Sequence, residues 1–257
     1  MVDDHSEYGS AASRFYDSTY ELLREGSGDR EFYRELARQS GGGPVLELGC
    51  GSGRVLLPIA RDGIESVGLD ASPDMLGRFR QKDALPNLTL VEGRMESFDL
   101  APRRFALVYS AFRAFQHLTS VEDQLACLVS VRRHLRPGGL FAFDVFSPRL
   151  DRIAVEEEPE TEDARFRDAS GAEVVRSVAI RRDVARQTQE VLFRFDRRPP
   201  GGPAETFFAP TSMRWFFRYE LEHLLARAGL TLIELFGRFD RSPFAADSPE
   251  MILIARP

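Results

Sequence analysis

Short apolar runs of strand length alternate with helical patterns through residues 44–146 of this 257-residue chain. The first run contains Val45, Leu46 and Leu48, and further strands are predicted over 65–70, 87–93, 103–112 and 139–146. Apolar positions at helical spacing fall between them, over 54–60, 73–82 and 120–135. Because apolar strands joined by helices build parallel sheets covered on both faces, the pattern predicts an α/β fold.

The patterns on either side are different. Helices are predicted over 12–24 and 30–39, and a helix over 217–230 precedes strands over 231–237 and 250–257. Residues 147–172 are polar and acidic, which is typical of a solvated loop. Residues 173–184 and 189–198 alternate around the turn ARQTQ and predict an antiparallel hairpin, with further extended structure before the last helix.

The length fits one domain with an insertion. We expect an N-terminal helical cap over 1–43, a core over 44–146, a β insertion over 147–214 that covers the mouth of the site, and a C-terminal helix and strands over 215–257.

Composition narrows the class of protein. The formal net charge of −6 argues against nucleic-acid binding, which needs a basic footprint. No apolar run approaches the ~20 residues of a transmembrane helix. The N-terminal segment MVDDHSEYGS lacks the apolar stretch of a signal peptide, so a cytoplasmic protein is expected. We further expect a monomer or a homodimer. The cysteines Cys50 and Cys127 have no metal-ligand spacing, and no metal is expected.

A glycine turn follows the first strand of the core. Its pattern E-x-G-x-G-x-G runs from Glu47 to Gly53 and precedes the helical pattern of 54–60. It matches neither the dinucleotide fingerprint G-x-G-x-x-G nor the phosphate loop. Glycine permits positive φ and lets a ligand lie against the main chain, and the following helix N-terminus favours an anionic or electron-rich group.

Further candidate residues lie where neighbouring strands end. Asp70 ends the strand over 65–70, while Arg94, Ser110 and Phe146 lie at the ends of the next three strands. Ligands of open parallel sheets bind beyond the carboxyl ends of the strands, so these positions and the glycine turn predict one site. An acid placed like Asp70 either accepts hydrogen bonds from ribose hydroxyls or caps the helix that starts at Ser72.

The segments ELGCGSG, GLD and RPGG make residues 44–146 similar to the class I S-adenosylmethionine-dependent methyltransferases, and residues 215–257 resemble them more loosely. The resemblance implies a Rossmann-like three-layer sandwich. Its seven-stranded sheet is mostly parallel and its last strand is antiparallel. The motif Y-D-x-x-Y at 16–20 and the segment RWFFRYEL resemble bacterial small-molecule methyltransferases, including N-methyltransferases of amino sugars.

This resemblance implies S-adenosylmethionine as the cofactor. Asp70 is expected to bind the ribose, and Arg94 replaces the aspartate with which the family recognises adenine. The aromatic pair Tyr16 and Tyr20 either closes over the sulfonium or packs in the core. The expected cofactor contacts are Tyr16, Tyr20, Glu47, Gly49, Cys50, Gly51, Gly53, Asp70, Ala71, Met75, Arg94, Met95, Ser110 and Phe112.

The implied reaction is in-line transfer of a methyl group to a nitrogen or oxygen atom of a small molecule, in which proximity and water exclusion supply most of the catalysis. A general base is needed only when the nucleophile is protonated. His117 is the candidate base, with a packed structural histidine as the alternative. Candidates for the acceptor side are Arg113, Phe146, Arg149, Arg214 and Trp215, of which the arginines suit an anionic substrate.

Two other functions fit parts of the sequence. A non-catalytic module that binds S-adenosylmethionine as a sensor or partner subunit fits the unusual Arg94. A nicotinamide oxidoreductase also has a strand, a glycine turn and an acid at the end of the next strand, but the glycines here are too closely spaced for its motif. Lys82, the sole lysine, also forms no Tyr-x-x-x-Lys pair.

Overall fold

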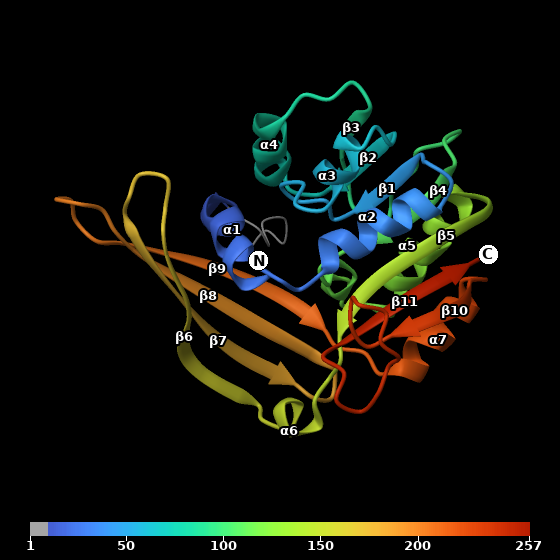
Figure 1. Cartoon of the computed structure of the whole chain (residues 1–257). Helices are drawn as coiled ribbons and strands as arrows, with labels where there is room; N and C mark the ends of the chain where they lie inside the picture. The colour runs from blue at the N-terminus through green and yellow to red at the C-terminus, as the bar shows by residue number, and fades with distance from the viewer. Residues whose placement is uncertain (1–9) are drawn as a thin grey trace. The chain divides into compact units, whose positions relative to one another are not determined.

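The computed structural model describes residues 10–257; residues 1–9, on which the expectation of a cytoplasmic protein partly rests, lie outside the described part. The described chain divides into two compact units (Figure 1). The core unit comprises Ser27–Pro148 and Trp215–Pro257, and the insertion unit comprises residues 10–26 and Arg149–Arg214.

A seven-stranded sheet forms the centre of the core unit. The strand order is β10 (Thr231–Phe236), β11 (Glu250–Arg256), β5 (Leu135–Phe146), β4 (Phe105–Ser110), β1 (Val45–Leu48), β2 (Ser66–Asp70) and β3 (Leu88–Glu92). Only β11 runs antiparallel to its neighbours β5 and β10. The predicted mostly parallel sheet with an antiparallel last strand is therefore confirmed.

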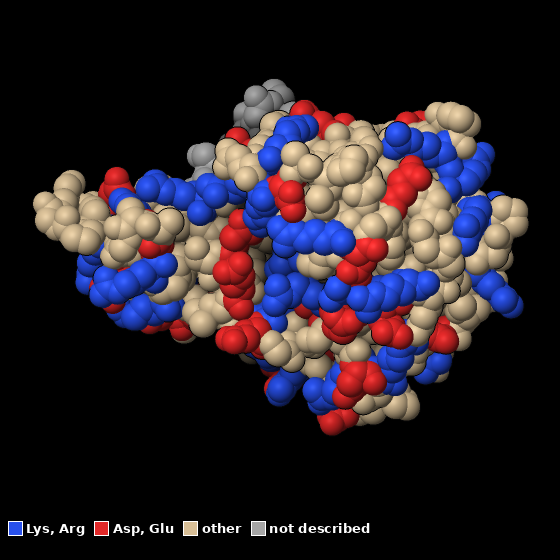
Figure 2. All heavy atoms as spheres, turned by 45° about the horizontal axis from the view of Figure 1, so that its top comes forward, with Lys and Arg blue, Asp and Glu red and all other residues tan. Residues whose placement is uncertain are grey.

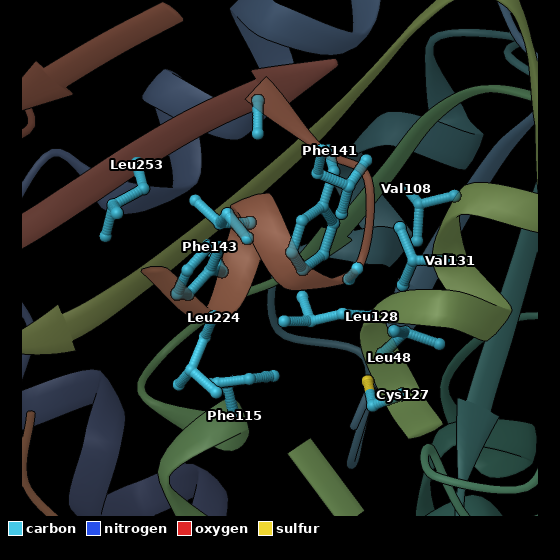
Figure 3. Close-up of a cluster of buried hydrophobic side chains, with 14 of the residues drawn as sticks. Leu48, Val108, Phe115, Cys127, Leu128, Val131, Phe141, Phe143, Leu224 and Leu253 are labelled. Atoms are coloured by element: carbon cyan, nitrogen blue, oxygen red, sulfur yellow. The ribbon is translucent and has the colours of Figure 1, made fainter. Parts of the chain in front are cut away.

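Helices cover both faces of this sheet. On one face lie α2 (Asp29–Gln39), α3 (Leu56–Arg61) and α4 (Pro73–Lys82), whose apolar side chains share a cluster with Val45, Leu107 and Ala142. On the other face lie α5 (Val121–His134) and α7 (Arg218–Arg227). Figure 3 shows the second cluster, with Phe141 and Phe143 of β5 among the side chains of these two helices.

The alternation of side chains along each strand decides which face a residue serves. Leu48 and Val108 belong to the cluster under α5 and α7, whereas Leu107 and Tyr109 belong to the cluster under α2. Since neighbours along a strand point to opposite faces, Glu47 shares the α2 face with Tyr109, to which its side chain is hydrogen-bonded.

One predicted strand boundary in the core is wrong. The strand expected over 139–146 begins at Leu135, which pairs with Phe105 before the register shifts. Gly138 has a φ of 75°, and a Cβ at Gly139 would lie 2.9 Å from the Phe105 carbonyl oxygen. The PGG segment therefore bends the strand and does not end it.

The insertion unit is a four-stranded antiparallel sheet with one long helix. The strands follow chain order: β6 (Glu157–Arg167), β7 (Glu173–Asp183), β8 (Thr188–Arg198) and β9 (Glu205–Arg214). Helix α1 (Ser10–Leu23) packs on this sheet through Phe15, whose ring stacks on Phe195 at 5.0 Å. A short helix, α6 (Leu150–Ile153), precedes β6.

The prediction of a solvated loop over 147–172 is wrong for its central part, which forms the edge strand β6. The acidic run is accommodated because arginines of the neighbouring strand pair with it: Asp163 with Arg176, and Glu158 with Arg182. A charged edge strand also resists pairing with other chains. The predicted hairpin is the centre of a larger sheet because β6 and β9 extend it on both sides.

Acidic and basic side chains lie beside each other on the face of the molecule shown in Figure 2. Ion pairs within one unit include that of Arg34 with Asp62. Within residues 10–257, no helix combines the length and the apolar character that crossing a bilayer requires.

Candidate functional site

The glycine turn after β1 is tightly fixed by its main chain. The amides of Gly49 and Cys50 both donate to the Leu69 carbonyl of the adjacent strand, at 2.8 and 3.0 Å. Gly49, Gly51 and Gly53 have φ values of 72°, 53° and 84°, a region that favours glycine. A Cβ at Gly49 would approach the Cβ of Ala114 to 2.8 Å, so the residues after β4 pack directly on this turn.

Asp70 joins the glycine turn to the start of α4. Its Oδ2 accepts a hydrogen bond from the Gly51 amide at 2.7 Å, and its Oδ1 accepts one from the Ser72 amide at 2.8 Å. Ser72 itself caps the helix through its hydroxyl, which accepts from the Met75 amide. Burial raises the pKa of Asp70, while the two amide hydrogen bonds oppose that rise.

A buried polar row lies on the α2 face beneath the turn. Glu47 is only 3% exposed and accepts a hydrogen bond from the Tyr109 hydroxyl at 3.2 Å. The Tyr109 ring stacks on Tyr33 of α2, with centroids 5.0 Å apart. Burial raises the pKa of Glu47 well above its ordinary value of 4.5, against the opposing effects of the Tyr109 hydrogen bond and the Arg54 charge.

We expect Glu47→Gln to stabilise the protein at pH 8 but not at pH 4.5. The folded state favours the protonated carboxyl, whereas the unfolded chain ionises near pH 4.5. Wild-type stability therefore falls as pH rises from 4.5 towards the folded-state pKa, and glutamine avoids this loss of about 1 kcal/mol per pH unit. Urea unfolding across this range measures the difference. The exposed Glu65→Gln is the control, and an equal gain at every pH would contradict the prediction.

Arg54 links the turn to the segment after β4. Its guanidinium is paired with Asp29 at the start of α2, with distances of 2.5 and 3.1 Å, and lies 5.1 Å from the centroid of the Phe112 ring. This pair was not singled out from the sequence. Arg54 follows the glycine motif directly, but its partner is 25 residues away and no local pattern indicates it.

The residues expected around the adenine lie in different environments. Met75 is buried, and its Cε is 3.0 Å from where a Gly51 Cβ would be. Met95 is half-buried near Gly49, whereas Ala71 is exposed. Arg94 is exposed and its guanidinium pairs with Glu96 of the same loop. Its charge is therefore partly neutralised next to the turn.

Three candidates inside the core unit are less accessible than a ligand contact requires. Ser110 is fully buried on the α5 face, beside Val108 in the alternation, and its hydroxyl has no hydrogen-bond partner among residues 10–257. Cys50 is buried, which raises the pKa of its thiol. Trp215 is 1% exposed. The contacts expected of these three residues stay predictions, with their side chains buried in the core unit.

The acceptor-side candidates are distributed over both units. In the core unit, Arg113 forms a two-point ion pair with Glu250 and lies over the Phe146 ring. His117 is half-buried in the short 3₁₀ helix η1 (Ala114–His117). In the insertion unit, Arg149 pairs with Asp151, and Arg214 is 3.5 Å from the side-chain oxygen of Gln187.

Tyr16 and Tyr20 belong to the insertion unit. Their rings meet edge to face at 4.6 Å, and the Tyr20 hydroxyl accepts a hydrogen bond from Arg176 at 3.3 Å. Arg176 is buried, is held by Asp163 and lies over the Phe193 ring. Tyr20 therefore fixes α1 on the sheet, while both tyrosine side chains stay partly exposed.

Comparison with known proteins identifies the family of this chain. A family model described as a methyltransferase domain matches residues 45–139. A malonyl-[acyl-carrier protein] O-methyltransferase from Enterobacter lignolyticus is 32% identical over 72% of this chain and 71% of its own length. A cypemycin N-terminal methyltransferase from a Streptomyces species is 27% identical over 98% of each chain.

A solved structure shares the fold. It is the S-adenosylmethionine-bound CalS10, an amino pentose methyltransferase from Micromonospora echinaspora. It covers 93% of this chain and 95% of its own, with 22% identity and a TM-score of 0.71. The motif, the sheet order and these relatives lead to one conclusion. The chain belongs to the class I S-adenosylmethionine-dependent methyltransferases, and S-adenosylmethionine is its cofactor.

Proposed function

We propose that this methyltransferase transfers the methyl group to an amine nitrogen of a small molecule. The observation that carries the proposal is the pairing of the candidate arginines. Of the three candidate arginines, Arg113 and Arg149 each have a carboxylate partner, so their charges are already balanced without an anionic substrate. Arg214 contacts the side-chain oxygen of Gln187. Arginine contacts to an anionic substrate are therefore less favoured, and a neutral amine fits the balanced charges better.

The relatives support an amine without deciding it. The cypemycin relative modifies an N-terminus, and CalS10 is described as an amino pentose methyltransferase, but the malonyl relative modifies oxygen. Methylation of oxygen in a small molecule is therefore the second possibility. Within the core unit, we assign the acceptor contacts to Arg113 and Phe146.

The cofactor supplies an activated methyl group on a sulfonium, and the chain's own residues bind and align it. In our proposal the main chain of Gly49–Gly53 receives the methionine part, Asp70 holds the ribose, and Met75 and Met95 enclose the adenine. Gly51 has positive φ, and a Cβ there would press against the Met75 side chain, so glycine keeps the turn beside Met75 free of a side chain. Because an amine reacts only when deprotonated, His117 is proposed to accept its proton.

The test is transfer by the purified protein from S-adenosylmethionine to a panel of amines, carboxylic acids and phenols, read by mass spectrometry. We expect methylation of amines, with a rate that rises with pH up to the pKa of the acceptor. His117→Ala should lower kcat more than KM and regain rate at high pH, whereas the exposed His223→Ala should not. Methylation of acids alone would contradict the proposal, and cofactor binding without turnover would indicate a sensor.

A further inference from the structure

Asp144 is a buried carboxylate inside an otherwise apolar strand. It lies near the end of β5 in the segment GLFAFDVF and is fully buried on the α2 face. Burying a carboxylate costs free energy unless hydrogen bonds compensate it. This residue therefore has a specific set of partners, and those partners indicate its role.

The partners of Asp144 lie in the segment after β4. Its Oδ1 accepts a hydrogen bond from the Phe112 amide at 2.8 Å, and its Oδ2 accepts one from the Arg113 amide at 3.0 Å. The hydroxyl of Tyr33 also donates to Oδ1, at 2.6 Å. One carboxylate thus orders two consecutive main-chain amides, while a tyrosine of α2 fixes the carboxylate.

The two residues that it holds are in an unfavourable conformation. Phe112 and Arg113 have φ values of 56° and 65°, and non-glycine residues adopt this left-handed region at a cost. Two such residues in succession persist only where surrounding contacts determine them. The paired amides that point at Asp144 supply those contacts.

The conformation of this segment matters to the cofactor turn. Immediately after it, the Cβ of Ala114 occupies the space that a side chain at Gly49 would need. The Phe112 ring lies beside Arg54, which follows Gly53, and Arg113 is directed to Glu250 and Phe146. A change at residues 112 and 113 would therefore move groups next to the turn.

We propose that Asp144 is a positioning residue for cofactor binding. It holds Phe112 and Arg113 in the left-handed conformation and so places Ala114 against the glycine turn. This role depends on the family's cofactor and not on which acceptor is methylated.

The experiment is a mutant cycle read by the affinity for S-adenosylhomocysteine in calorimetry. Asp144→Asn keeps the shape but removes one of the two acceptors that face main-chain amides. We expect it to raise Kd about tenfold, which corresponds to about 1.4 kcal/mol. In an Arg113→Gly background the same substitution should raise Kd about threefold or less, because glycine adopts positive φ without strain.

Arg113→Ala is the matched control. It removes the same guanidinium as Arg113→Gly but keeps the strained main chain, so Asp144→Asn should again raise Kd about tenfold in that background. If Asp144 has a purely structural role, Asp144→Asn should lower the affinity equally in the Arg113→Gly and Arg113→Ala backgrounds. That result would overturn the proposal. An unchanged Kd in folded Asp144→Asn would also overturn it.

Tyr33→Phe provides a milder variant if Asp144→Asn does not fold. It removes one donor to the carboxylate, and we expect it to raise Kd less than Asp144→Asn does. This rise should disappear in the Arg113→Gly background and persist in the Arg113→Ala background. The exposed Tyr219→Phe of α7 is its control, because the Tyr219 hydroxyl is not among the partners of Asp144. Equal effects of Tyr33→Phe in the glycine and alanine backgrounds would count against Asp144 as the positioning residue.

Discussion

Gly53→Ala is expected to destabilise the protein by about 2–5 kcal/mol and to abolish measurable cofactor binding at ordinary concentrations. Gly53 has a φ of 84°, where an alanine costs about 1–2 kcal/mol. In addition, its Cβ would overlap the ring of Phe79, a fully buried side chain of α4. Overpacking in a core typically costs a further 1–3 kcal/mol, roughly. Urea unfolding and calorimetric titration with S-adenosylmethionine measure the two effects.

Gly63→Ala separates the two causes. Gly63 also has positive φ, at 86°, but a Cβ there meets nothing within 4 Å. We expect Gly63→Ala to lower the free energy of unfolding by about 1 kcal/mol through backbone strain and to leave the cofactor affinity unchanged. If Gly53→Ala is no more destabilising than Gly63→Ala, the contact with Phe79 does not restrict this position. If it also binds the cofactor normally, the turn has no role in binding.

Asp70→Ala is expected to weaken the binding of S-adenosylmethionine about 30-fold or more. The substitution removes the acceptor for the Gly51 and Ser72 amides and, in our proposal, the acceptor for the ribose. Hydrogen bonds to a charged group contribute about 1.5–3 kcal/mol each, and about 2 kcal/mol is already a factor of 30 in affinity. The effect should exceed that of a ribose contact alone, because the glycine turn also loses its order.

Asp74→Ala provides the control for charge. Asp74 lies in the first turn of the same helix but is exposed, so its loss should leave the affinity within about threefold. Calorimetry with S-adenosylmethionine and with S-adenosylhomocysteine gives the affinities, and the melting temperature reports on folding. An Asp70→Ala protein that folds and binds both nucleosides like the wild type would remove Asp70 from the site.

The sheet order and the site differ in how far the sequence could predict them. The apolar runs and the helical spacing identify the strands and helices of residues 44–146, and the family motif implies their order. The glycine turn was also visible in the sequence, and the acid Glu47, the spacing of the glycines and the resemblance to the family together predicted that it binds the cofactor. The environment of Arg94 could not be predicted from the sequence, because its pairing with Glu96 depends on the conformation of the loop.

The strand β6 was missed because charge alone was considered. Its acidic residues suggest a solvated loop until the arginines of β7 lie beside them, and that pairing is a tertiary fact. Asp144 was missed for a related reason. A lone acid in the apolar run GLFAFDVF is a visible signal, but its partner Tyr33 is 111 residues away in the chain.

The sequence by itself determined the alternation of strands and helices and the glycine turn, and its resemblance to the methyltransferase family implied the cofactor. The strands, helices and turn depend on local properties, namely the period of apolar residues and the φ values open to glycine, which a few adjacent residues encode. Only the tertiary structure decided which charges neutralise each other and which carboxylate orders the segment after β4. Such pairings depend on the path of the whole chain, because hydrogen bonds and ion pairs act over a few ångströms between residues far apart in sequence.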